Sequence, residues 1–155
     1  MTERSAYISR VAPAAIAACS GTSLFASLQI AQAILESNNG NSKLAADYNN
    51  HFGIKADKSW TGKKVMLPTR EVLNGKSVVV NAAFRVYDSI EEGFKDRNKF
   101  LKENPRYSKA GVFTAATPED QAKAFQAAGY ATDPEYAKLL ISVINGSGKL
   151  KQYDP

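Results

Sequence analysis

Residues 24–37 carry the pattern that most limits how this chain can fold. Apolar side chains recur there at helical spacing, and one stripe holds Leu24, Leu28, Ala31 and Leu35, with Ile34 beside it. A helix that is apolar on nearly all sides belongs at the centre of a domain. Ser23 is its expected N-cap, and Asn39-Gly40 is expected to end it. The sequence therefore predicts a domain built around this helix.

Glu36 lies in the last turn of this apolar helix. Helix C-termini carry partial negative charge, and apolar surroundings disfavour an ionised carboxylate, so both effects raise the pKa of such a group. A carboxylic acid that stays protonated near neutral pH can give its proton to a leaving oxygen, as glycosidases require. Glu36 is therefore the first candidate catalytic residue.

Length and charge limit the class of protein. The 155 residues are enough for one domain with its own core, and we expect residues 1–155 to form a single catalytic domain. No apolar run approaches the roughly 18–20 residues of a membrane helix, so no membrane insertion is expected. The net charge of +5 suits polyanionic partners, including the acidic polymers of a bacterial wall. Because the basic residues are spread out and not interleaved with stacking aromatics, nucleic acid is not expected as a partner.

The rest of the chain predicts an α+β fold that is mostly helical. Two β-rich arms, residues 63–73 and 76–87, flank Asn74-Gly75, which is the strongest short hairpin signal. Helix-start signals occur at Ser89–Glu92, Thr117-Pro118 and Asp133-Pro134, and an N-terminal helix over residues 3–18 is expected to bend or restart at Pro13. The hairpin, about residues 63–87, would form one wall of a cleft against the helices.

Glu71 lies in the first arm of this hairpin. Two carboxylates that face one groove from different lobes can serve glycoside hydrolysis, one as acid and the other as base or nucleophile. Among 15 acidic residues such pairs are common, and a single Glu is most often a solvated surface group. The pattern alone therefore supports Glu36 more strongly than Glu71.

Other reactive side chains are few. With one histidine, His51, and one cysteine, Cys19, the chain lacks the partners of a zinc site or a nucleophilic triad. We expect no metal and no cofactor, a loop histidine without a catalytic role, and a buried thiol. Trp60 and Tyr130 lie in loop-like segments, where an aromatic ring can stack on a sugar.

Five separated motifs resemble glycoside hydrolase family 73, the peptidoglycan N-acetylglucosaminidases of flagellar and autolysin type. They are AQAILES at residues 31–37, NNHFGIK at 49–55, TRE at 69–71, FRVY at 84–87 and GYATDPEYA at 129–137. The resemblance runs in order through nearly the whole chain. Two positions depart from the family pattern: His51 stands where an apolar residue is usual, and Asn38-Asn39 replaces a Gly-Trp-like pair.

The resemblance implies a lysozyme-like fold with a small β-lobe, and hydrolysis of the β-1,4 bond after N-acetylglucosamine. By matched position, Glu36 would be the general acid and Glu71 the second carboxylate. Tyr130 would line the glycan cleft, and Asn50, Phe52 and Trp60 join it as substrate-binding candidates. Asp96, on the helix after the hairpin, would be a supporting acid, with a salt-bridge role equally open.

Several alternatives stay open. A muramidase or lytic transglycosylase can use the same scaffold, and a degenerate site would leave a wall-binding module. The expected partners are peptidoglycan glycan strands and, for an antibacterial effector, a cognate immunity protein in the cleft of a monomeric enzyme. The sequence shows no convincing signal peptide. We therefore expect action in the periplasm or extracellular wall, reached through a dedicated secretion system or phage lysis.

Overall fold

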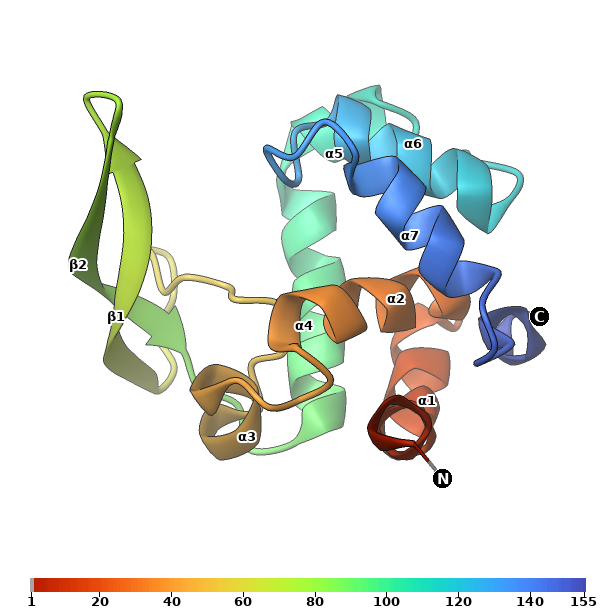
Figure 1. The fold of residues 1–155 in the computed structure, drawn as a ribbon, viewed down its shortest axis with the longest axis horizontal. Coiled ribbons are helices and arrows are strands. Elements are labelled where there is room, and N and C mark those ends of the chain that lie inside the picture. Colours follow the sequence, from red (N-terminus) through yellow and green to blue (C-terminus); the bar gives the residue numbers. More distant parts are fainter. Residues whose placement is uncertain (1) are drawn as a thin grey trace.

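Helix α2 (Ala26–Ser37) lies at the centre of the helical body, as its apolar pattern predicts. In a computed structural model, which describes residues 2–155, α2 contacts α1 (Glu3–Cys19), α6 (Pro118–Ala127), α7 (Tyr136–Ile144) and the 3-10 turn η1 (Leu150–Tyr153). Ile30, Ala31 and Ala33 of α2 are fully buried. The central helix is therefore surrounded by elements from both ends of the chain (Figure 1).

The remaining helices lie between α2 and α6 in the sequence. They are α3 (Lys43–Tyr48), α4 (Ile90–Glu103) and α5 (Pro105–Lys109). Helix α4 packs against α1 and begins at Ser89, whose hydroxyl accepts a hydrogen bond from the Glu92 amide, as the capping-box spacing predicts. Thr117 caps α6 in the same way.

Strands β1 (Lys64–Leu73) and β2 (Lys76–Arg85) form one antiparallel hairpin that extends away from the helical body (Figure 1). Asn74 and Gly75 adopt the left-handed conformation that a two-residue hairpin turn requires. Glu71 pairs with Val78, and side chains alternate between a half-buried and an exposed face. The predicted hairpin and the mostly helical α+β fold are both confirmed.

Helix α1 continues through Pro13 without a restart, and the alternative expectation of a bend there stays a prediction. Local predictions failed at two helix starts. Helix α2 begins at Ala26 and not after Ser23, because Ser23 takes a left-handed conformation and Phe25 is the N-cap. Helix α7 begins at Tyr136, after a turn in which Asp133 accepts from the Glu135 amide. The short helices α3 and α5 were not predicted, since five or six residues carry little periodic signal.

Within residues 2–155, no helix combines the length and apolarity needed to cross a membrane.

Candidate active site

Glu36 lies at the C-terminal end of α2 and lines a groove of about 470 Å³. Glu36 as a whole residue is exposed to solvent at the groove, while the surrounding protein removes part of the water around its carboxyl. This partial loss of water raises the pKa of the Glu36 carboxyl, and the positive charge of Arg97 opposes the rise. The direction that the sequence predicted is therefore confirmed, and burial is its main cause.

The turn after Glu36 holds the end of α2 in place. Asn38, Asn39 and Gly40 all have positive φ, so the chain reverses sharply there. A side chain at Gly40 would collide with Tyr7 and Arg10 of α1. Asn38 caps the helix through its backbone amide, which donates to the Ile34 carbonyl. The Asn-Asn-Gly sequence is thus the stop that positions Glu36 at the groove.

The groove runs between the helical body and the hairpin. Besides Glu36, it is lined by residues from the start of α3, the loop after α3 and both strands: Ser42, Lys43, Leu44, Phe52, Gly53, Lys55, Leu67, Pro68, Thr69 and Phe84. A largely apolar lining with a few polar and charged groups is typical of ligand-binding sites. The groove is the cleft that the order of elements predicted.

Glu71 lies on the half-buried face of β1, the face that also carries Leu67 and Thr69 of the groove. Its carboxylate accepts a hydrogen bond of 2.5 Å from Nζ of Lys55, which lines the same groove. Glu71 itself is not among the residues that line the groove. Glu36 and Glu71 thus come from different elements, α2 and the hairpin, and Lys55 connects Glu71 to the groove.

Two of the candidate residues, Asn50 and Phe52, lie in the loop after α3, and they have different surroundings. Phe52 lines the groove and packs edge-on against Phe94, with ring centroids 4.8 Å apart. Asn50 is only 1% exposed, and its amide group bonds to the backbone of Ile54 and Arg85. Asn50 therefore connects the loop to β2 through these hydrogen bonds. Substrate binding by Asn50 stays a prediction, which its burial does not favour.

Tyr130 is half-buried in an aromatic cluster with Tyr107, Phe125 and Tyr136. Its hydroxyl accepts a 3.2 Å hydrogen bond from Arg97 of α4. The same nitrogen of Arg97 donates to Gln32 of α2 at 2.6 Å. Sequence reasoning missed both Arg97 and Gln32. The available signal was a polar amide inside an apolar helix, since a buried amide requires a partner.

Trp60 and Asp96, like Glu71, Asn50 and Tyr130, are not among the residues that line the groove. Trp60 packs edge-on against Tyr87, and the guanidinium of Arg85 lies 4.7 Å from its ring centre. Asp96 accepts hydrogen bonds from Arg85 and from the hydroxyl of Tyr87. Asp96 therefore has the salt-bridge role that was left open, and it joins α4 to the end of the hairpin.

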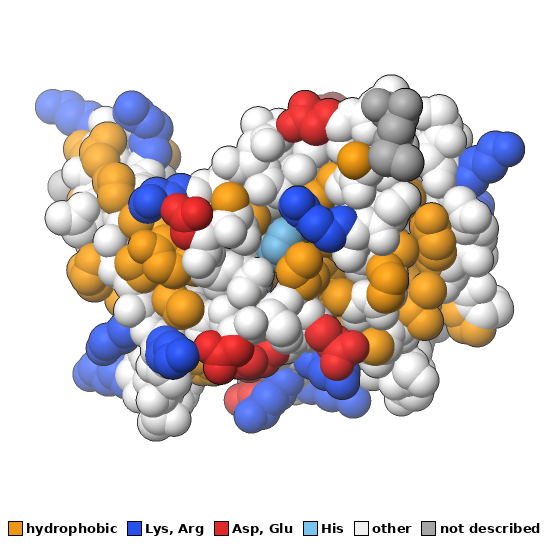
Figure 2. Space-filling model, turned by 90° about the horizontal axis from the view of Figure 1, so that it is seen from below, with side chains coloured by type: hydrophobic (Ala, Val, Ile, Leu, Met, Phe, Trp, Pro, Cys, Tyr) orange, Lys and Arg blue, Asp and Glu red, His pale blue; other side chains and the backbone are white. Residues whose placement is uncertain are grey.

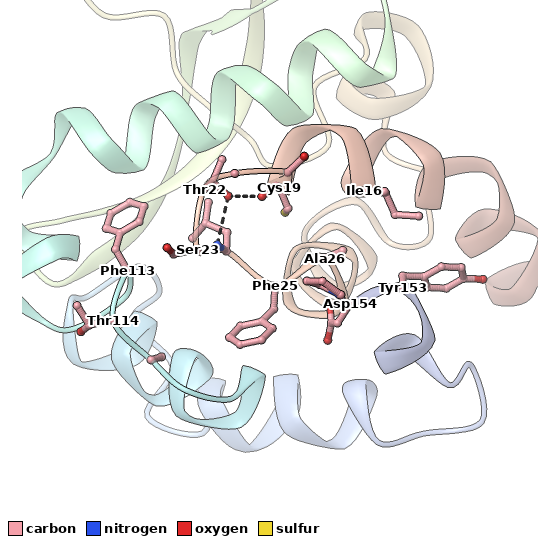
Figure 3. Close-up of a pocket in the computed structure, with 15 residues that line it drawn as sticks. Ile16, Cys19, Thr22, Ser23, Phe25, Ala26, Phe113, Thr114, Tyr153 and Asp154 are labelled. Carbon is pink, nitrogen blue, oxygen red and sulfur yellow. Dashed lines mark hydrogen bonds between the residues drawn. The ribbon is translucent and has the colours of Figure 1, made fainter.

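A second cavity, of about 710 Å³, opens where α1 ends and α2 begins (Figure 3). Phe25, Phe113 and Tyr153 line it together with the polar side chains of Thr22 and Asp154. None of the candidate site residues lines this cavity. In the described part of the chain, no three His, Cys, Asp or Glu side chains are grouped as a metal site would need.

Comparison with known proteins places this geometry in context. Residues 12–149 match the family model described as glucosaminidase, mannosyl-glycoprotein endo-beta-N-acetylglucosaminidase. Peptidoglycan hydrolase FlgJ of Salmonella typhimurium is 46% identical over 121 residues, 76% of this chain and 38% of that protein. A probable N-acetylmuramidase of Lactococcus lactis is 42% identical over 146 residues, 90% of this chain and 33% of that protein.

Among solved structures, the catalytic domain of the autolysin Auto from Listeria monocytogenes superimposes with a TM-score of 0.88. It is 35% identical to this chain, and the match covers 99% of this chain and 89% of that one. The chain spans less than half the length of the two curated relatives. That residues 1–155 form a single catalytic domain stays a prediction.

Proposed function

The chain belongs to the glucosaminidase family, glycoside hydrolase family 73 of the lysozyme-like type, and on that basis we propose that it hydrolyses β-1,4 bonds of peptidoglycan after N-acetylglucosamine. The observation that carries the proposal is Glu36, a carboxyl with a raised pKa on the wall of a groove. The names of its relatives support peptidoglycan as the polymer that the groove accepts.

Glu36 is the proposed general acid. Because burial favours its protonated form, it can give its proton to the glycosidic oxygen as the bond to the sugar carbon breaks. A water molecule then supplies the oxygen that joins the sugar carbon. The water's proton goes to a base, or the carbon is first held by a carboxylate nucleophile.

Glu71 is the proposed second carboxylate, in one of these two roles. Glu71 is outside the groove lining, but it shares the half-buried face of β1 with Leu67 and Thr69 and is paired with Lys55, and all three of these residues line the groove. Proton NMR of the first products would show whether the anomeric configuration is inverted or retained, and so identify the role of Glu71.

Substitution of the acid tests the assignment directly. Glu36→Gln should lower the release of soluble fragments from purified peptidoglycan by about 10²- to 10⁴-fold, the usual contribution of a general acid. Glu91→Gln, on the exposed face of α4, is the matched control and should keep wild-type activity. Full activity of Glu36→Gln would remove Glu36 from the mechanism.

Reducing-end analysis of the same digests tests which bond is cut. Glucosamine at the new reducing ends is expected. Muramic acid there would indicate a muramidase, an alternative that the name of the Lactococcus relative favours. Anhydro ends, with activity kept in Glu71→Ala, would indicate a transglycosylase. Binding to wall material without soluble products would indicate a binding module.

An antibacterial effector role with a cognate immunity protein is a finer part of the proposal. Lys43 and Lys55 lie on the groove beside Glu36, and the chain has a net charge of +5, so an acidic inhibitor would complement the site. Delivery by a secretion system or by phage lysis would bring the enzyme to the periplasm or wall. Co-purification from the native host tests for the inhibitor: a bound acidic protein that blocks hydrolysis is expected, and active enzyme alone would argue for phage release.

A further inference from the structure

Arg97 is a buried cation without an ionic partner. It is 1% exposed, and no carboxylate in residues 2–155 lies within 4.0 Å of its guanidinium. Burying a charge in this way costs several kcal/mol unless other groups compensate for the lost water. The compensation here is a set of neutral partners, which leaves the positive charge itself unneutralised.

These partners are parts of the candidate site or adjoin it. The guanidinium donates to Gln32 of α2 at 2.6 Å, to Tyr130 at 3.2 Å and to Asn98 at 3.1 Å. Its centre lies 4.5 Å from the ring centre of Phe52, which lines the groove. Arg97 therefore joins α4 to the central helix, to Phe52 of the loop after α3 and to Tyr130.

The contact with Gln32 places this charge near Glu36. Residues four apart on a helix lie on the same face, about one turn or 5–6 Å from each other. Helical side chains also lean toward the N-terminus, so the Glu36 side chain is directed over the turn that carries Gln32. In agreement, the charge of Arg97 acts on the ionisation of Glu36.

We infer that Arg97 is a positioning residue: its unpaired charge balances the Glu36 carboxylate after proton donation, and its stacking and hydrogen bonds hold Phe52 and Tyr130 beside the groove. The inference rests on the proposed function. The ground state needs a neutral Glu36, whereas the state after transfer has an anion in a partly dehydrated groove. A fixed cation stabilises the second state without having to reorganise.

Other ionisable groups around Arg97 and Glu36 do not replace this interaction. Cys19 of α1 and the hydroxyls of Tyr130 and Tyr136 have raised pKa values, so all three are neutral over the working pH range. Lys43 of α3 and Lys55 of the loop after α3 also line the groove. Each of these lysines already pairs with a carboxylate, Asp47 or Glu71.

The test compares Arg97→Met with Arg97→Lys. The methionine keeps an apolar stem without charge, and the lysine keeps the charge without the planar fork. Carbon-13 NMR of the labelled glutamate carboxyls gives the pKa of Glu36, and kcat/KM against pH gives the limit of activity at high pH. Losing a nearby cation raises a carboxyl pKa. In Arg97→Met, the Glu36 pKa and the high-pH limit of kcat/KM should therefore both move to higher pH, while kcat falls about tenfold or more.

Arg97→Lys should keep the Glu36 pKa close to that of the wild type, with a raised KM because Phe52 and Tyr130 lose their support. An unchanged Glu36 pKa in folded Arg97→Met would overturn the inference. If that variant does not fold, Gln32→Leu provides the second measurement, since releasing the guanidinium from α2 should also raise the Glu36 pKa; no shift there would overturn the inference as well.

These outcomes are separable from failure of the proposed function. The NMR titration needs no substrate, so it tests the coupling of Arg97 to Glu36 even if peptidoglycan is not cleaved. Suppose that the wild type hydrolyses peptidoglycan, that Glu36→Gln does not, and that the Glu36 pKa is the same in Arg97→Met as in the wild type. This result would support the proposed function and reject the inference.

Discussion

His51 is a polar side chain in the middle of the core. It is 2% exposed and packs between the rings of Tyr7 and Phe94. Its Nδ1 lies 2.6 Å from the Tyr7 hydroxyl, and Nε2 has no hydrogen-bond partner. Burial, with a smaller contribution from Arg10, lowers the pKa of His51 to about 4. The sequence left it as a loop histidine without a role, and the structure makes it a core residue.

Because the pKa of His51 is lowered, we expect the stability of the protein to fall at acid pH. Since its pKa is about 6.5 when unfolded and about 4 when folded, its contribution is complete above pH 6.5 and is lost as the pH falls toward 4. The shift corresponds to about 3 kcal/mol at most. His51→Leu should therefore lose less unfolding free energy than the wild type between pH 7 and pH 4.5, as measured by urea denaturation.

Tyr7→Phe is the matched control for this measurement. It removes the hydroxyl beside Nδ1 but keeps the buried imidazole, so it should retain the pH dependence of the wild type. Equal losses of stability in His51→Leu and the wild type would show that other groups carry the acid sensitivity.

At the scale of elements, one cluster attaches the hairpin to the helical body. Asp96 of α4 accepts a 2.9 Å hydrogen bond from Arg85 at the end of β2 and a 2.5 Å bond from Tyr87. Arg85 is 7% exposed, so these partners compensate for the cost of burying its charge. Because the hairpin carries Glu71, this cluster also sets where the second carboxylate can lie.

Asp96→Ala should lower the free energy of unfolding by about 2–4 kcal/mol, because Asp57, at 3.8 Å, is then the carboxylate that remains within 4.0 Å of the buried Arg85. Hydrogen exchange should accelerate in β1 and β2 more than in α2. Tyr87→Phe removes one of the two bonds and should show a smaller change in both measurements. Unchanged exchange in the hairpin of Asp96→Ala would contradict the proposed attachment.

The outer face of the hairpin differs from its groove face. Met66, Val72, Leu73 and Val79 are more than half exposed. Hydrophobic side chains are visible on the surface at the hairpin end of the molecule (Figure 2). The hairpin could be predicted because Asn74-Gly75 and alternating side chains are local signals. The partner of its inner face could not, since that depends on how the loop after α3 folds.

For the whole molecule, the last residues of the chain stabilise the start of the central helix. The N-cap of α2, Phe25, has no side-chain cap. Asp154 takes this role: it accepts a 2.8 Å bond from the Ser27 amide and a 2.6 Å bond from the Ser27 hydroxyl. A carboxylate at a helix N-terminus is also favoured by the helix dipole.

Asp154→Ala should therefore destabilise the fold by about 1–2 kcal/mol, as the loss of a local cap does. Thermal unfolding compares it with Thr117→Ala, which removes the local cap of α6. Asp154→Asn keeps one acceptor and should lose less stability than Asp154→Ala. If Asp154→Ala unfolds at the wild-type temperature, this long-range cap does not contribute.

The sequence by itself determined the features that depend on neighbours along the chain. These include the apolar central helix, the stop that follows Glu36, the hairpin turn and the caps of α4 and α6. It also predicted the raised pKa of Glu36, because the position of an acid in an apolar helix can be read directly.

Only the tertiary structure decided which distant groups meet. Asp154 at Ser27, Asp96 at Arg85 and Arg97 at Gln32 are contacts between residues 127, 11 and 65 positions apart. No local pattern encodes such pairs, because each forms only when the packing of apolar faces brings its helices together. A buried polar group then bonds whatever partner that packing supplies, since leaving it without one costs more than the bond itself contributes.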